Sequence, residues 1–265
     1  MNANARESRS YAGGSRSDRL DCERRRGCCS TRRSNSNRWS LPWRATPTWT
    51  PSSPRSGSAG WQTTSPEEQA DDAAALLDAL GIGPAAVFGT SGGGVFALCL
   101  LVRHPEVVRG LILHEPGLYA LVDNFDSVRA PIRALVEDAK QAGGPSAAVE
   151  RFWCYIVEDE DGWNRLEPAL RKRLRATAST LFEVELGTYE LYLPDEQTLA
   201  SLASPVRLVV SEDGFPFFVE IADRLGQRLG VDVATTPGRH DGYHEYPSAF
   251  ADALRPFLRE LTGDG

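Results

Sequence analysis

The sequence lacks long apolar runs, and this limits what kind of protein it can encode. None of its uninterrupted hydrophobic stretches approaches the roughly 20 residues that a membrane-spanning helix needs. It also lacks the charged and then apolar leader that marks a secreted protein. We therefore expect a cytoplasmic protein that has no membrane partner.

Histidines are scarce near the cysteines, which argues against a zinc site. The protein has five cysteines and four histidines. Cys22, Cys28 and Cys29 crowd one polar stretch, but the first histidine of the chain is His104. A zinc site normally combines such cysteines with nearby histidines or with a second pair of cysteines. We expect free thiols and no metal.

Residues 1–60 contain little that could form a hydrophobic core. Leu20 and Leu41 are their only members of the Leu, Ile and Val set, whereas arginine and serine contribute 12 residues each. Such a segment buries too little apolar surface to offset the entropy lost on ordering. We expect it to be disordered or poorly packed. The abrupt change of composition near Gly60 suggests the hypothesis that part of it is a wrong-frame translation.

The charge is distributed unevenly along the chain. The formal net charge is −7, but residues 1–60 carry +8 and the remainder carries −15. An acidic body behind a basic leader argues against nucleic acid as the main partner. A small molecule is the expected partner instead.

From Ser65 onward the sequence has ordinary helix and strand signals. Ser65, Pro66 and Glu68 form a capping box with proline at the first helical position, and a helical apolar pattern then runs to Gly81. The next segments predict a strand, a helix and a strand over 85–89, 93–105 and 107–116. This order is typical of a βαβ unit with parallel strands.

The rest of the chain continues the same pattern after a long interruption. Residues 118–203 predict helices throughout, a strand follows at 205–213, and 231–240 predicts a strand and then a loop before an amphipathic helix at 247–261. The predicted fold is therefore α/β, with a parallel sheet flanked by helices. We assign residues 61–117 and 204–265 to the core and 118–203 to a helical cap.

The sequence Gly89-Thr90-Ser91-Gly92-Gly93 has the spacing G-x-S-x-G of a nucleophile elbow. In an elbow the serine lies in a strained turn, and the glycines two places on either side remove Cβ atoms that would clash. The pattern is weak by itself, but here an apolar strand ends at Gly89 and a helix starts at Gly92. This context favours an elbow over a phosphate-binding loop, because no Lys-Ser or Lys-Thr pair follows. The amide of Gly92, at a helix N-terminus, is a candidate oxyanion donor.

Partners for Ser91 are expected where later strands end. Asp213 ends the strand 205–213, and His240 lies in the loop that follows the strand at the start of 231–240. His244 competes with His240, but the position directly after a strand favours His240. The chain order Ser, Asp, His is the order that α/β hydrolases use.

These segments resemble the α/β-hydrolase fold superfamily, in particular its small, capped, esterase-like bacterial members. The sequences GTSGGG, HPEVVRGLILHEP, VVSED and PGRHDGYHEYP carry the resemblance, which covers 65–117 and 205–261. It implies hydrolysis of a carboxylic ester or a related acyl bond, without metal or organic cofactor. It also implies Ser91 as nucleophile, Asp213 as orienting acid and His240 as base.

The beginning of the chain departs from this family. Members normally begin with several strands, one of which precedes a His-Gly loop that supplies an oxyanion donor. Residues 1–60 show neither feature. We interpret the N-terminal strands as degraded or missing, and the second oxyanion donor is unassigned.

Substrate preference must come from the cap. Phe125, Trp153 and Phe182 are candidate walls of an apolar pocket, although helices of a cap bury aromatic side chains as core just as readily. We expect an apolar ester. The same triad also serves C–C bond hydrolases and perhydrolases, and a non-catalytic binding protein or the inactive product of a frameshifted gene remains an alternative.

Overall fold

The computed structural model describes residues 64–188, 190 and 192–262. The predictions for residues 1–60, including the free thiols of Cys22, Cys28 and Cys29 and the shifted reading frame, lie outside the described residues. Within this part of the chain, no helix is both long enough and apolar enough to cross a membrane.

Four parallel strands form one sheet in the described residues, in the order β1-β2-β3-β4. The strands are β1 (Ala85–Thr90), β2 (Val108–His114), β3 (Val206–Ser211) and β4 (Val233–Thr236). Each lies within or beside a segment for which the sequence predicts a strand. Because all four run in the same direction, their carboxyl ends meet at one edge of the sheet.

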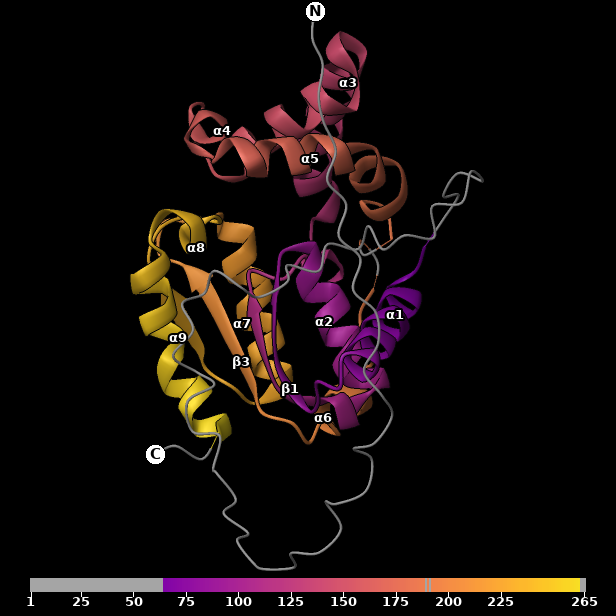
Figure 1. The fold of residues 1–265 in the computed structure, drawn as a ribbon, viewed down its shortest axis with the longest axis vertical. Helices are drawn as coiled ribbons and strands as arrows, with labels where there is room; N and C mark the ends of the chain where they lie inside the picture. Colours follow the sequence, from indigo (N-terminus) through magenta and orange to yellow (C-terminus); the bar gives the residue numbers. More distant parts are fainter. Residues whose placement is uncertain (1–63, 189, 191, 263–265) are drawn as a thin grey trace, which may run out of the picture. The chain divides into compact units, whose positions relative to one another are not determined.

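Helices cover both faces of this sheet (Figure 1). Alternate strand residues point to opposite faces, so Leu111 and Leu113 pack in one hydrophobic cluster while Ile112, between them, packs in another. The first cluster includes side chains from α1 (Pro66–Ala79), α2 (Gly92–Arg103) and α7 (Pro216–Leu229), and the second includes those of α9 (Pro247–Thr262). The predicted capping box of α1 is present, with Ser65 Oγ accepting a hydrogen bond from the Glu68 amide.

A helical insertion separates β2 from β3. It consists of η3 (Tyr119–Leu121), α3 (Phe125–Ile156), α4 (Gly162–Arg165), α5 (Pro168–Thr180), the π-helical turn η4 (Leu181–Glu185) and α6 (Glu196–Ala200). The backbone of α3 breaks at Gly143 and Gly144, where Gly144 has φ = 73°. The insertion has hydrophobic clusters of its own, one around Ile132 and Val136 and one around Trp163.

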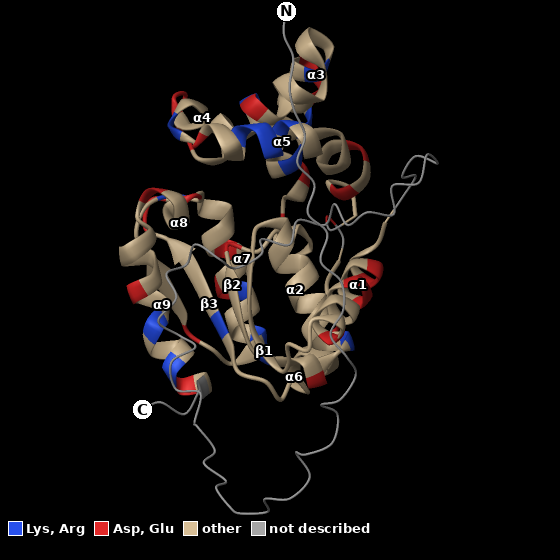
Figure 2. Ribbon diagram, viewed as in Figure 1, with Lys and Arg blue, Asp and Glu red and all other residues tan. Residues whose placement is uncertain are grey.

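Charged side chains are segregated among these helices (Figure 2). Basic residues gather on α5, and acidic residues gather on α1. On α5 they are Arg171, Lys172, Arg173 and Arg175, and on α1 they are Glu67, Glu68, Asp71, Asp72 and Asp78. The acidic excess predicted for the body of the chain is therefore not uniform over its surface.

Candidate active site

Ser91 lies in a strained turn between β1 and α2, as the elbow motif predicts. Its backbone has φ = 52° and ψ = −129°, a conformation that typically costs a non-glycine residue about 1–3 kcal/mol. Three backbone hydrogen bonds hold it there. Its amide donates to the His114 carbonyl at 3.1 Å, and its carbonyl accepts from the amides of Gly94 and Gly117, both at 2.9 Å.

The close packing that requires glycine involves Gly89 and Gly94. A Cβ at position 89 would lie 2.7 Å from the Ala97 Cβ, and one at position 94 would lie 2.8 Å from the Pro116 Cβ. A Cβ at Gly93 would meet nothing within 4 Å. The G-x-S-x-G motif predicts the second clash at Gly93. It occurs one residue later, because α2 turns Gly94 toward the end of β2.

These two neighbouring glycines give a matched test of elbow packing. We expect Gly94→Ala to lower the free energy of unfolding by about 1–3 kcal/mol, because its Cβ must displace Pro116. Gly93→Ala places its Cβ in open space on a helix and should raise that free energy by up to about 1 kcal/mol. Urea unfolding measures both changes. Equal stability of the two variants would contradict the packing described above.

The amide of Gly92 is available to an incoming group. Gly92 is the first residue of α2, so its N–H has no partner in the preceding turn, and it makes no hydrogen bond to another described residue. A Cβ at Gly117 would lie 3.5 Å from the Gly92 nitrogen. The absence of a side chain at position 117 therefore leaves room beside this amide.

His240 is paired with Glu115. The Nδ1 atom of His240 lies 2.5 Å from Oε2 of Glu115, and both side chains are buried. Glu115 directly follows β2, and His240 lies in the loop after β4, so both are at the edge of the sheet where Ser91 follows β1. The His240 ring also stacks on Phe218, with ring centroids 4.8 Å apart and an interplanar angle of 2°.

The sequence predicts that Asp213 pairs with His240, but the structure does not bring these two side chains together. Asp213 lies in the turn after β3, where its amide donates to the Gly238 carbonyl at 3.1 Å, and its carboxylate makes no hydrogen bond to another described residue. The position on Nδ1 is occupied by Glu115 instead. Glu115 directly follows β2, and its carboxylate lies against His240.

Backbone hydrogen bonds hold Glu115 in place, and its surroundings favour the charged form of its side chain. Its φ is 44°, its amide donates to the Val209 carbonyl, and its Oε1 accepts from the Ser211 amide at 2.9 Å. A Cβ at Gly214 would lie 2.3 Å from Oε1, so glycine is needed there. Burial alone would raise the pKa of Glu115. The hydrogen bond from His240, the two nearby histidines and the Ser211 amide outweigh burial and lower that pKa.

Ser91 and His240 share the edge of the sheet, but the described residues show no hydrogen bond between them. Such a bond often tightens only when substrate is bound. The competing His244 lies 6.1 Å from Trp153 and 4.5 Å from Tyr243, measured between ring centroids, and no carboxylate pairs with it. The geometry therefore favours His240 over His244.

The three aromatic residues proposed for substrate binding lie in different environments. Phe125 lines a small cavity of about 20 Å³ together with Tyr119, Arg129, Ile132, Arg133, Phe152, Leu186 and Glu190. Trp153 packs against the main hydrophobic core, and Phe182 packs against Phe152 inside the insertion. Of the three, Phe125 has the surroundings of a pocket wall.

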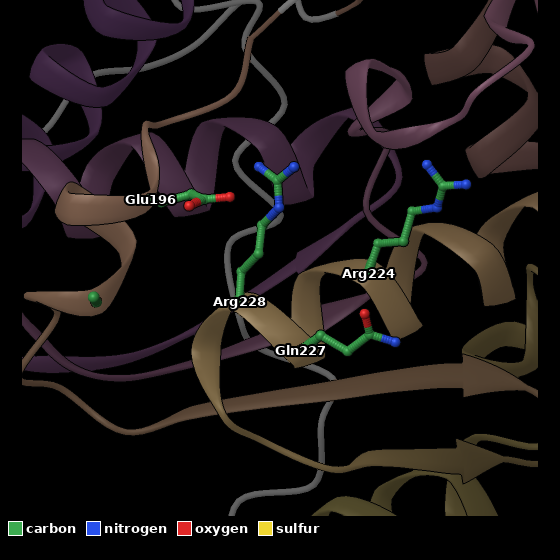
Figure 3. A pocket seen from close by; sticks show the side chains of 5 residues that line it. Glu196, Arg224, Gln227 and Arg228 are labelled. Carbon is green, nitrogen blue, oxygen red and sulfur yellow. The ribbon is translucent and has the colours of Figure 1, made fainter.

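A larger groove of about 610 Å³ lies elsewhere, between α6 and α7 (Figure 3). It is lined by Glu196, Ala200, Arg224, Gln227 and Arg228. Since α7 begins at the carboxyl edge of the sheet and rises about 1.5 Å per residue, Arg228 lies about 15 Å along the helix from Phe218. This groove is therefore separate from the site around Ser91.

The part of the chain that the structure describes contains no candidate metal site. Those residues contain no group of three or more His, Cys, Asp or Glu side chains that could hold a metal ion.

Comparison with known proteins identifies the family. The family described as the alpha/beta hydrolase fold matches residues 25–153. YraK, an uncharacterized hydrolase of Bacillus subtilis (strain 168), is 30% identical over 201 residues, which make up 73% of this chain and 70% of that protein. The chain belongs to the α/β-hydrolase fold family. The family match begins at residue 25, upstream of the motifs on which the sequence resemblance rests.

Solved structures agree with this α/β hydrolase in fold. A carboxylesterase of the thaumarchaeon Nitrososphaera gargenis has a TM-score of 0.59 and 18% identity, over 77% of this hydrolase and 75% of that chain. The N-acyl homoserine lactonase AidH in complex with N-hexanoyl homoserine has a TM-score of 0.55 and 22% identity, over 75% of this hydrolase and 71% of that chain. At such identities the likeness shows the fold, and the predicted fold class is confirmed.

Proposed function

We propose that this α/β hydrolase cleaves carboxylic esters or related acyl bonds of small molecules. Ser91 is the nucleophile, His240 its base, and Glu115 the acid that orients His240. The observation that carries the proposal is the buried hydrogen bond of 2.5 Å between Glu115 and His240, at the edge of the sheet where Ser91 is held in its strained turn. A carboxylesterase and a lactonase are among the structures that share the fold.

The first half of the reaction forms an acyl-enzyme. Because Glu115 accepts a hydrogen bond from Nδ1–H, the neutral imidazole of His240 presents the lone pair of Nε2. Nε2 takes the hydroxyl proton as Ser91 Oγ bonds to the substrate carbonyl carbon. The C–O bond to the alcohol then breaks, and the alcohol leaves with that proton.

The second half regenerates the enzyme. His240 takes a proton from water, the hydroxide bonds to the acyl carbon, and the ester bond to Ser91 Oγ breaks as Oγ recovers a proton. The negative oxygen that forms in both halves is stabilised by the Gly92 amide at the start of α2. One such donor typically contributes about 3–4 kcal/mol to the stabilisation of the transition state.

Residues 118–203 serve in this proposal as a cap that selects the substrate. The cavity beside Phe125 has mostly apolar walls, in particular Tyr119, Ile132 and Leu186. Its volume of about 20 Å³ holds little more than one water molecule, so a substrate must enlarge it. The apolar walls favour an apolar acyl or alcohol group.

A fluorophosphonate probe tests this proposal without assuming a substrate. Such a probe phosphonylates the activated serine of a serine hydrolase, and its adduct is located by mass spectrometry of peptides. We expect one adduct, on Ser91, together with turnover of a short-chain p-nitrophenyl ester that the probe abolishes. A folded protein that neither reacts with the probe nor hydrolyses the ester would overturn the proposal.

A further inference from the structure

A second buried histidine lies beside the proposed catalytic pair. His114, the last residue of β2, has no exposed surface, and its two ring nitrogens each have a hydrogen-bond partner. Nδ1 lies 2.9 Å from Thr90 Oγ1, and Nε2 lies 3.0 Å from Ser211 Oγ. Ser211 Oγ in turn lies 2.8 Å from the carbonyl oxygen of Arg239, the residue before His240. These contacts join β1, β2 and β3 to the histidine loop.

The direction of each hydrogen bond in this chain follows from the chemistry of its ends. A carbonyl oxygen only accepts, so the single hydroxyl proton of Ser211 is donated to Arg239. Ser211 Oγ must therefore accept from His114 Nε2–H. Burial lowers the pKa of His114 to about 3, so at neutral pH the ring carries one proton, which is on Nε2. Nδ1 then accepts from the Thr90 hydroxyl.

Ser211 also contacts the acid of the proposed triad. Its backbone amide donates to Glu115 Oε1 at 2.9 Å, while Glu115 Oε2 pairs with His240. One residue thus holds Glu115 through its amide and the loop of His240 through its hydroxyl. The guanidinium of Arg239 gives that loop a second anchor by donating to the Glu158 carbonyl at 2.9 Å.

We propose that His114 and Ser211 are positioning residues for His240, an inference that rests on the function proposed above. The single ring proton of His114 commits the Ser211 hydroxyl to the Arg239 carbonyl, and this sets His240 against Glu115. His114 itself does not act as a base, because it is buried and both of its nitrogens are occupied.

Two substitutions of His114 separate this role from simple packing. In His114→Gln the side-chain amide nitrogen reaches about as far as Nε2 and can still donate to Ser211. In His114→Asn the shorter side chain reaches only toward Thr90, so the donor to Ser211 is lost. Both variants remove the ring that packs against Phe88 and Phe250. Their losses of packing should therefore be similar.

We expect His114→Asn and Ser211→Ala to lower kcat for a p-nitrophenyl ester by about 10²-fold, because a misplacement of about 1 Å costs that much. KM should change little, and His114→Gln should keep most of the kcat. The pH profile of kcat/KM should shift in the two impaired variants, because His240 is then less firmly paired with Glu115. Other ionisable groups near His240 are His114, Asp241 and Arg239. Equal kcat for the Gln and Asn variants would overturn the proposal.

A measurement on the wild-type protein is independent of turnover. With four histidines in the chain, side-chain ¹⁵N NMR can resolve the tautomer of each ring. We expect His114 to carry its proton on Nε2 and to remain neutral from pH 8 down to about pH 5. A proton on Nδ1, or protonation of His114 in that range, would overturn the positioning role. A wild-type protein without esterase activity but with this tautomer would instead count against the proposed function alone.

Discussion

We expect Ser91→Ala to lower kcat for a short-chain p-nitrophenyl ester by about 10⁶-fold. The reason is that no other group replaces Oγ as nucleophile: the covalent path is lost and His240 is left with no hydroxyl to deprotonate. The remaining rate should come from the Gly92 amide and from substrate binding. Because Ser91 is held by backbone hydrogen bonds, its replacement by alanine should leave the fold intact. Initial rates with purified protein measure the change.

Ser201→Ala is the matched control for this experiment. Ser201 is exposed at the end of α6, where its hydroxyl donates to the Thr198 carbonyl, and it lies outside the proposed site. The control should retain the wild-type kcat. A Ser91→Ala variant that hydrolyses the ester at a similar rate would exclude Ser91 as the nucleophile.

The second large effect should follow from Glu115→Gln, for which we expect a loss of about 10⁴-fold in kcat. The amide of glutamine can donate to Nδ1, and the imidazole would then carry its proton on Nε2, where it cannot accept one from Ser91. Glutamine still offers an oxygen to the Ser211 amide. The variant therefore tests the tautomer of His240 more than the stability of the site.

Asp213→Asn distinguishes the two carboxylates that compete for this role. The Asp213 side chain makes no hydrogen bond to another described residue, so its replacement should leave kcat near the wild-type value. If Asp213→Asn caused the large loss and Glu115→Gln did not, the acid would be the one expected from the sequence. The pairing of Glu115 with His240 would then not be the working arrangement.

The parts of the fold that sequence could predict are those with local signals. The capping box at Ser65, the apolar strand β2 and the turn at Ser91 each depend on neighbouring residues. Their bounds agree with the structure within a few residues. The choice of His240 over His244 also came from local context, since His240 lies directly in the loop after β4.

The sequence did not point to Glu115, because its pairing with His240 depends on tertiary contacts. It follows a buried strand just as Asp213 does, so sequence position alone gives both carboxylates the same claim. The strand order places the end of β2 next to Ser211 of β3, and the fold brings His240 to the same carboxylate. Two local signs point the same way: the left-handed φ of Glu115, and Gly214, whose missing side chain makes room for the carboxylate. The surroundings of Phe125, Trp153 and Phe182 depend on tertiary contacts in the same way, since aromatic residues in helices either pack as core or line a pocket.

The helical insertion leaves the core after Glu115 and returns just before β3, and the two ends are joined by neighbouring strands and by the hydrogen bond from Ser211 to Glu115. The pairing of the proposed acid and base is therefore held by residues of the core, and the insertion adds the Glu158 carbonyl that accepts from Arg239. Insertions are tolerated well where their two ends lie close together. Under the proposed function, exchanging this segment would change which molecules reach Ser91 and would leave Ser91, Glu115 and His240 on the core.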